Sequence, residues 1–305
     1  MQMNGARALL ESLKAEGVEV VFGYPGGAVL TLYDEVYKMN FPHVLTRHEQ
    51  GAAHAADGYA RASGKVGVAF ATSGPGATNL VTGIATAHMD SVPMVCITGQ
   101  VANPYIGKDS FQEADIVGIT TPITKHNYLV KDVNDIPRVV KEAFYIARTG
   151  RPGVVVIDVA KDVFDTPIEY CYPEMVELHG YTGDVPYEVP AVWEAAEALA
   201  AAHRPLLFVG GGVVLSDTSA YVRELLTLTG MPSVATLMGI GGVSAETEGY
   251  TGMAGMHGAY ASNMAIQECD LLLALGTGEQ QRQGGGSAGP VRPVRMLPGV
   301  PPVRL

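Results

Sequence analysis

Apolar positions follow two alternating periods over residues 1–160. Segments with the helical spacing of apolar residues, such as 6–15 and 136–148, alternate with short apolar runs typical of buried strands. The expected strands are 18–22, 43–48, 66–72, 93–98 and 153–159. Strands that alternate with helices form βαβ units around a mainly parallel sheet, with helices on both faces. The pattern therefore predicts an α/β fold.

A second α/β pattern begins near residue 189. Its expected strands are 205–209, 233–237 and 270–275, and its expected helices are 190–202, 217–228 and 259–268. This order is similar to half of a doubly wound, Rossmann-like nucleotide-binding domain. The stretch between the two patterns is rich in Pro, Tyr and Glu and has no period, so we interpret it as a linker. The predicted division is a first domain over 1–165, a linker over 166–188 and an incomplete Rossmann-like domain over 189–276.

Composition and charge narrow the class of protein. The chain of 305 residues is 47% hydrophobic and 17% charged, which is enough apolar material for two cores. A net charge of −11 argues against nucleic acid and anionic membranes as partners. No run reaches the roughly 18 apolar residues of a membrane span, and no targeting peptide precedes the first helix. Cys96, Cys171 and Cys269 are too few and too scattered for a disulfide framework. We expect a cytoplasmic protein.

The most informative motif surrounds Glu49, within the stretch from Arg47 to Arg61. Glu49 stands at a strand-to-helix junction, before a helix rich in Ala and Gly, whose small side chains let a neighbour enclose the carboxylate. An enclosed carboxylate holds its proton more readily and can share it with a ligand. The alternative is that Glu49 only favours the positive end of the following helix. The residues by themselves leave both interpretations open.

Three glycine-rich loops each follow an expected strand, at residues 23–28, 72–79 and 210–212. Such loops bring backbone N–H groups close to a ligand. Many α/β turns have the same composition, and Gly210-Gly-Gly212 lacks the full dinucleotide fingerprint. Taken singly, each loop is also compatible with a simple tight turn.

Together, in this order and spacing, the motifs resemble the acetolactate synthase large-subunit family of thiamine-diphosphate enzymes. The likeness covers residues 3–276. It includes Thr98-Gly-Gln100, Asp109-Ser-Phe-Gln-Glu113, Thr124-Lys-His-Asn-Tyr-Leu-Val130, Gly150-Arg-Pro-Gly153, Val156-Ile-Asp-Val-Ala-Lys-Asp162 and Met253-Ala-Gly-Met-His-Gly258. The resemblance implies a pyrimidine-binding domain with a parallel sheet, followed by a central domain associated with FAD.

The resemblance also implies roles for individual residues. The glutamate that matches Glu49 hydrogen-bonds N1′ of the cofactor's aminopyrimidine ring. The segments near the thiazolium ring and around the pyrimidine are matched by Tyr24, Pro25, Gly26, Gly27, Thr72, Pro75 and Asn79. Phe111, Gln112 and Lys161 match residues at the entrance, where a lysine attracts an anionic keto acid. The expected catalytic residues are therefore Glu49, Gln112 and Lys161.

A further set of positions matches the family's FAD-lining residues. It consists of Arg151, Gly210, Gly211, Gly212, Thr236, Leu237, Met238, Gly255, Met256 and His257. FAD is expected to be structural, because the implied reaction involves no net redox change. By residue type alone, His257 would more often be a packed or surface histidine, and Lys161 a solvated charge at a strand end.

The implied activity is decarboxylation of pyruvate and ligation of the product to pyruvate or 2-ketobutyrate, in isoleucine and valine biosynthesis. The family also implies a homodimer and a small regulatory subunit. Its Mg²⁺, which anchors the cofactor diphosphate, is held by a Gly-Asp-Gly motif with a downstream Asn. That motif does not occur in this sequence. We therefore expect the chain to bind only the pyrimidine half of thiamine diphosphate and to be inactive alone.

The sequence departs from the family at two places. Ala102-Asn-Pro104 stands where many relatives have Pro-Arg-Arg, which changes the charge of the entrance. Residues 277–305 are rich in Gly, Pro and Arg, and their only acid is Glu279. A one-base shift in the codons of 279–283 permits a family-like Ser-Asn-Arg-Val pattern. We interpret 277–305 as a disordered tail produced by a frameshift, with a natural disordered tail as the alternative.

Two other interpretations of the function remain at this point. The first is another thiamine-diphosphate carboligase or decarboxylase that acts on a different 2-keto acid. The second is a non-enzymatic remnant that dimerises with, or regulates, a complete subunit. Bound flavin would distinguish an acetolactate synthase from the first of these alternatives. Co-purification with a longer relative would favour the second.

Overall fold

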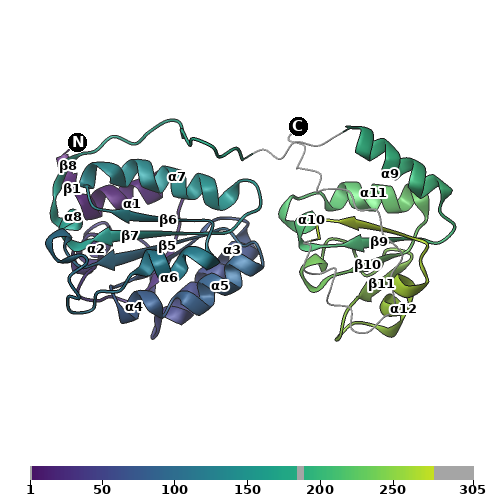
Figure 1. Cartoon of the computed structure of the whole chain (residues 1–305), viewed down its shortest axis with the longest axis horizontal. Coiled ribbons are helices and arrows are strands. Elements are labelled where there is room, and N and C mark those ends of the chain that lie inside the picture. The colour runs from purple at the N-terminus through teal and green to yellow at the C-terminus, as the bar shows by residue number, and fades with distance from the viewer. Residues whose placement is uncertain (1, 184–188, 278–305) are drawn as a thin grey trace. The chain divides into compact units, whose positions relative to one another are not determined.

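The computed structural model describes residues 2–183 and 189–277, and these fall into two compact units with the boundary after Gly183. Each unit has its own sheet and its own hydrophobic core (Figure 1). Both sheets are parallel and covered by helices, so the predicted α/β fold is confirmed. Residues 278–305, for which we expect a tail, lie outside the described residues.

The first unit is built on a six-stranded parallel sheet with the order β3-β2-β4-β5-β7-β6. The strands are β2 (Val21–Gly23), β3 (His43–Leu45), β4 (Gly67–Ala71), β5 (Met94–Gln100), β6 (His126–Val130) and β7 (Val154–Ala160). All residues of β4, β5 and β7 are buried, as expected for central strands covered on both faces. The carboxyl ends of the six strands consequently meet at one edge.

Helices cover both faces of this sheet. One core joins it to α1 (Gly5–Ala15), α2 (Leu30–Lys38) and α7 (Ile136–Arg148). The other joins it to α3 (Glu49–Ser63), α4 (Pro75–Thr78), α5 (Val81–Met89) and α6 (Ile116–Thr120), which lie on the opposite side in Figure 1. Here α3 and α5 approach so closely that a Cβ on Gly83 would lie 2.4 Å from Cβ of Ala53. The small residues of α3 thus allow close packing, as the sequence indicates.

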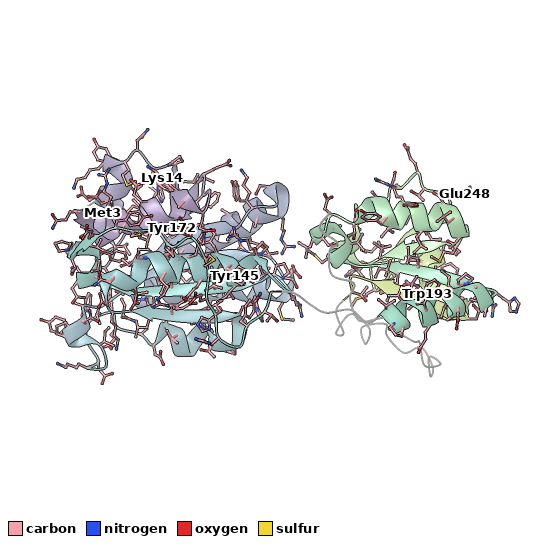
Figure 2. The ribbon with its side chains drawn as sticks, turned by 90° about the horizontal axis from the view of Figure 1, so that it is seen from above. Met3, Lys14, Tyr145, Tyr172, Trp193 and Glu248 are labelled. Carbon is pink, nitrogen blue, oxygen red and sulfur yellow. The ribbon has the colours of Figure 1, made fainter. Side chains whose placement is uncertain are left out.

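Residues that follow the first sheet also belong to the first unit. After α8 (Lys161–Asp165), strand β8 (Pro167–Glu169) pairs antiparallel with β1 (Gln2–Asn4). Tyr172, labelled in Figure 2, donates a hydrogen bond of 2.7 Å from Oη to the buried carboxylate of Glu16. Residues 167–183 of the predicted linker are therefore attached to this unit by a short strand pair and by tyrosine hydrogen bonds. Residues 184–188 lie outside the described part.

The second unit contains a four-stranded parallel sheet with the order β11-β10-β9-β12. The strands are β9 (Pro205–Val209), β10 (Ser233–Ala235), β11 (Tyr250–Met253) and β12 (Leu271–Leu275). The helices are α9 (Val189–Ala201), α10 (Gly211–Leu215), α11 (Ser219–Thr229) and α12 (Tyr260–Glu268). In chain order this is the 3-2-1-4 arrangement of a doubly wound sheet, which confirms the Rossmann-like prediction. Within the described ranges, no helix is both long and apolar enough to cross a membrane.

Candidate functional site

The candidate site lies at the carboxyl edge of the first sheet, where β2, β3 and β4 end. The loop after β2 is joined to the loop after β4 because the Ala28 amide donates to Thr72 Oγ1 at 3.1 Å. The loop after β3 is joined to β2 through the Thr46 amide, which donates to the Gly23 carbonyl at 3.0 Å. Ligands of parallel α/β sheets bind outside the carboxyl ends of the strands. The three loops that carry the predicted thiamine-binding residues thus converge where a ligand is expected.

Glu49 is the first residue of α3, and only 7% of it is exposed. Asn79 holds one carboxylate oxygen by donating from Nδ2 to Oε2 at 2.9 Å. The other oxygen, Oε1, accepts no hydrogen bond from any residue that the structure describes. The positive end of α3 also favours a carboxylate here, but that effect requires neither burial nor an unmatched oxygen. Oε1 is therefore available to accept a hydrogen bond from, or share a proton with, a ligand that reaches this edge of the sheet.

Gly76 packs closely against Thr72 beside the unmatched oxygen. A Cβ at this position would lie 3.2 Å from Glu49 Oε1 and 2.7 Å from Thr72 Cγ2. Pro75 begins α4, which directs the chain from Thr72 past Gly76 to Asn79. The structure therefore brings Glu49, Thr72 and Asn79 together around Gly76, where a larger residue would collide with Thr72 and crowd the Glu49 carboxylate.

The loop after β2 packs on Thr72 through one of its two neighbouring glycines. A Cβ on Gly26 would lie 2.4 Å from Thr72 Cγ2, whereas a Cβ on Gly27 would meet no atom within 4 Å. Neither glycine has a left-handed φ, so the difference between them is one of space alone. Tyr24, which is 41% exposed, and Pro25 precede this pair on the same loop.

This difference predicts unequal effects of the same substitution at adjacent positions. Gly26→Ala should lower the free energy of unfolding by about 1–3 kcal/mol, the usual result of overpacking. Gly27→Ala is the matched control and should change stability by less than about 0.5 kcal/mol. Thermal unfolding of the two variants beside the unaltered chain measures both values. Equal losses, or a larger loss for Gly27→Ala, would contradict the packing of Gly26 on Thr72.

Gln112 reaches the same group of loops through its backbone. Its carbonyl oxygen lies 2.5 Å from the position that a Cβ on Gly74 would occupy, just before Pro75. Both Gln112 and Gly74 have a φ of +57°, which is uncommon for a residue other than glycine. The side chain of Phe111, next to Gln112, is 87% exposed. The structure thus places the 111–112 segment beside the glycine loop after β4.

Lys161 follows β7 at the same edge of the sheet and begins α8. Its side chain is exposed, and none of the described contacts joins it to Glu49 or Gln112. A catalytic role for Lys161 therefore stays a prediction.

The positions predicted to line FAD fall in both units. In the first unit, Arg151 donates from Nε to Ser91 Oγ at 2.6 Å and from Nη2 to the Met89 carbonyl at 3.2 Å. In the second unit, segments 210–212, 236–238 and 255–257 follow β9, β10 and β11, so they share the carboxyl edge of that sheet. Their protruding side chains include Leu237, Met256 and His257, which are exposed.

A buried polar cluster, for which the sequence predicted no role, lies on β5 and β7 of the first sheet. Asp158, on β7, is 1% exposed and accepts hydrogen bonds from Thr98 Oγ1 at 2.6 Å and Gln100 Nε2 at 2.8 Å. Burial raises the pKa of Asp158 to about 6, although these two hydrogen bonds act in the opposite direction. The available signal was a single acid inside the otherwise apolar run 154–160.

Tyr33 is a second residue without a predicted role. Its Oη is buried without a hydrogen-bond partner among the described residues, and it lies against Gly23 at the end of β2. Burial, with a smaller contribution from the negative charge of Glu49, raises the pKa of Tyr33. The hydroxyl of Tyr33 therefore remains protonated beside Gly23, at the carboxyl edge of the sheet.

Comparison with known protein families shows which family this chain belongs to. Residues 3–119 match the family described as "Thiamine pyrophosphate enzyme, N-terminal TPP binding domain". Residues 192–294 match "Thiamine pyrophosphate enzyme, central domain". The chain belongs to the thiamine pyrophosphate enzyme family. The resemblance predicted from the motifs is confirmed, and the first match contains the loops that carry Glu49, Thr72 and Asn79.

Several curated proteins that are similar to the chain are named acetolactate synthases. The chain is 53% identical to the acetolactate synthase of Mycobacterium bovis over 285 residues, which is 93% of this chain and 46% of the relative. It is 48% identical to the acetolactate synthase isozyme 2 large subunit of Escherichia coli, over 93% of this chain and 51% of that protein. The large subunit from Porphyra purpurea is 50% identical, with 93% and 49% covered. The chain spans about half the length of the curated relatives it matches.

Proposed function

We propose that the chain supplies the pyrimidine-side half of an acetolactate synthase active site. The observation that carries the proposal is the state of Glu49, which is nearly buried, held by Asn79 at one oxygen and unmatched at the other. The aminopyrimidine of thiamine diphosphate is flat and has a ring nitrogen that can share a proton with such an oxygen. The residues present therefore fit this part of the cofactor.

Each residue of the site has a distinct task in this proposal. Asn79 donates to Oε2 and so fixes the carboxylate plane, which leaves Oε1 to hold or release a proton. Thr72 anchors the loop after β2 through the Ala28 amide, and Gly76, which has no Cβ, lets the chain pass close to Thr72 and Oε1. Thiamine diphosphate, when bound, supplies a carbon nucleophile and accepts the electrons released by decarboxylation of a 2-keto acid. Glu49 then acts as the proton relay at the pyrimidine end of the site.

The substrates we propose are pyruvate and a second 2-keto acid, either pyruvate or 2-ketobutyrate. Gln112 and Lys161 would act at the entrance, where the exposed ammonium of Lys161 attracts a carboxylate. The support for this assignment is that the relatives which resemble the chain over 93% of its length are named acetolactate synthases. A homodimer and a regulatory subunit belong to the same proposal.

We propose that FAD binds at the carboxyl edge of the second sheet. Segments 210–212, 236–238 and 255–257 gather there, and the glycine-rich turn after β9 allows close approach of a ligand. Mg²⁺ would be bound by residues other than those described, since they include no group of three His, Cys, Asp or Glu suited to a metal. The three cysteines are free, which agrees with a reducing compartment and supports a cytoplasmic location.

The experiment that tests the proposal has a binding arm and an activity arm. Ligand-observed NMR measures binding of 4-amino-5-hydroxymethyl-2-methylpyrimidine, the pyrimidine fragment of thiamine, to the chain. We expect binding that Glu49→Ala abolishes and Glu19→Gln leaves unchanged, because Glu19 is exposed and precedes β2 at the opposite edge of the sheet. Binding that survives Glu49→Ala would remove the basis of the proposal.

The activity arm measures acetolactate formation from pyruvate with thiamine diphosphate, Mg²⁺ and FAD. It compares the chain with a full-length version completed from the Mycobacterium bovis relative. We expect activity in the full-length version, with bound flavin. Activity on a different 2-keto acid without flavin would instead favour another thiamine-dependent carboligase. Folded protein that binds the pyrimidine fragment but is inactive on every 2-keto acid would refute the enzymatic assignment.

A further inference from the structure

The segment before Glu113 has an unusual backbone. Between Gly107 and Gln112 three residues have a positive φ: Gly107 at +79°, Asp109 at +53° and Gln112 at +57°. Left-handed conformations in residues other than glycine persist only where surrounding contacts determine them. Two such residues lie next to the predicted substrate entrance, so the contacts that hold this segment bear on the site.

The Glu113 carboxylate provides those contacts. Its Oε2 accepts hydrogen bonds from the amides of Ser110, at 2.8 Å, and Lys108, at 3.3 Å, and its Oε1 accepts one from the amide of Gly107. Hydrogen bonds from Ser110 and Gly107 lower the pKa of Glu113, so the carboxylate is charged near neutral pH. Charged acceptors make the stronger hydrogen bonds of this kind. A single side chain thus gathers three amides into a closed loop, which we name the 107–113 loop.

Contacts elsewhere tie down the two ends of this loop. Before it, the Asn103 amide donates to Asp162 Oδ1 at 3.0 Å, and Ile106 packs partly against the core. After it, Gln100 Nε2 donates to the Ala114 carbonyl at 2.9 Å. Among the described residues, Glu113 is the only side-chain acceptor for the amides from Gly107 to Gln112. Ser110 Oγ and the Lys108 amide also donate to the Tyr105 carbonyl, at 3.0 and 3.3 Å, and the Glu113 amide donates to the Ser110 carbonyl at 2.9 Å. The Glu113 carboxylate adds to these contacts the bonds that gather the amides of Gly107, Lys108 and Ser110.

The closed loop rests on the glycine loop that faces Glu49. The Gln112 carbonyl occupies the space beside Gly74 where any other residue would place its Cβ, at 2.5 Å. Gly74 leads through Pro75 to Asn79, which holds the Glu49 carboxylate. The 107–113 loop therefore contacts Gly74 through Gln112. One helical turn, α4, separates Gly74 from Asn79, which holds the proton-relay carboxylate of Glu49.

We propose that Glu113 is a positioning residue, whose carboxylate closes the 107–113 loop and thereby holds Gln112 against Gly74 at the substrate entrance. The assignment rests on the proposed function, because the role of Gln112 toward a 2-keto acid comes from it. Glu113 itself contacts backbone amides only. Its loss acts through the placement of Gln112, and it leaves the proton relay at Glu49 in place.

The first test measures the loop directly. Amide hydrogen exchange of Gly107, Lys108 and Ser110 is followed by NMR in the full chain and in Glu113→Gln. We expect exchange to quicken by about tenfold or more, because an amide replaces a charged acceptor of three hydrogen bonds. Glu19→Gln is the matched control, since Glu19 is an exposed carboxylate elsewhere that accepts hydrogen bonds from side chains only. Unchanged exchange in Glu113→Gln overturns the proposal whatever the activity.

The second test asks whether Glu113 acts through Gln112. In the full-length version, Gln112→Ala, Glu113→Gln and the double variant are compared by KM and kcat for pyruvate. If Glu113 only positions Gln112, the double variant should be impaired no more than Gln112→Ala alone. Additive effects would overturn the proposal even if exchange quickens. A full-length protein that does not act on pyruvate refutes the proposed function instead, and the exchange result still decides whether Glu113 closes the loop.

Discussion

Replacing Glu49 with glutamine is expected to lower acetolactate formation by about 10²–10⁴-fold, the usual contribution of a proton-transfer group. Glutamine has nearly the same shape as glutamate, and its amide oxygen can still accept the hydrogen bond from Asn79. The change therefore removes proton exchange at Oε1 and little else. Turnover should collapse, while the fold and the packing around Gly76 remain.

The measurement is steady-state turnover of pyruvate in the full-length version with saturating thiamine diphosphate, Mg²⁺ and FAD. Glu19→Gln again serves as the control and should retain full activity, since Glu19 bonds Tyr59 and Lys65 away from the candidate site. Circular dichroism and thiamine diphosphate binding establish that the variant is folded and loaded. If loaded Glu49→Gln retains more than about a tenth of the turnover, Glu49 is not the proton relay.

The strands that the sequence predicted are those with continuous apolar runs. β4, β5 and β7 are central and fully buried, so their residues are apolar except for Thr98, Gln100 and Asp158 near the carboxyl ends of β5 and β7. β6 was not predicted because it lies at the edge of the sheet, where His126 and Leu129 are exposed and the apolar run is broken. β11 is a short edge strand that contains Gly252 with a φ of +100°. β6 and β11 thus leave too faint a hydrophobic pattern in the sequence, whereas β3 and β12, which are also edge strands, were predicted.

The residues of the candidate site also fall into those that the sequence predicted and those that it did not. Glu49, Thr72 and Asn79 lie within short motifs that follow strands, so the motifs indicated that they gather at one edge of the sheet, and the structure joins Glu49 to Asn79 there. Glu113 was visible only as part of a family-like segment. Its role depends on the seating of Gln112 on Gly74, a contact between residues far apart in the chain, which no local pattern encodes.

The buried carboxyl of Asp158 should make the first unit less stable as the pH rises from about 4 to about 6. In the unfolded chain Asp158 ionises near 3.8, whereas burial raises its pKa in the folded chain to about 6. Between these values the folded state binds more protons than the unfolded state, so the free energy of unfolding falls with rising pH. At 1.36 kcal/mol per pH unit the full loss is about 3 kcal/mol, complete above pH 6.

Asp158→Asn should abolish this loss, because an amide is neutral throughout the range and has the shape of the protonated acid. Its oxygen can accept from Gln100, and its NH₂ can donate to Thr98, so both neighbours keep a partner. Urea unfolding followed by circular dichroism, at intervals between pH 4 and pH 7, measures the free energy for both proteins. We expect the difference to move by about 3 kcal/mol in favour of the variant across this range.

Asp132→Asn provides the control, since Asp132 is an exposed carboxylate that accepts a hydrogen bond from the Asn134 amide. It should leave the pH dependence of unfolding unchanged. If Asp158→Asn also follows the unaltered chain at every pH, Asp158 does not take up a proton in this range. In that case Thr98 and Gln100 stabilise the ionised carboxylate enough to offset its burial, and a charged group stands at the anchor of the 107–113 loop at every pH tested.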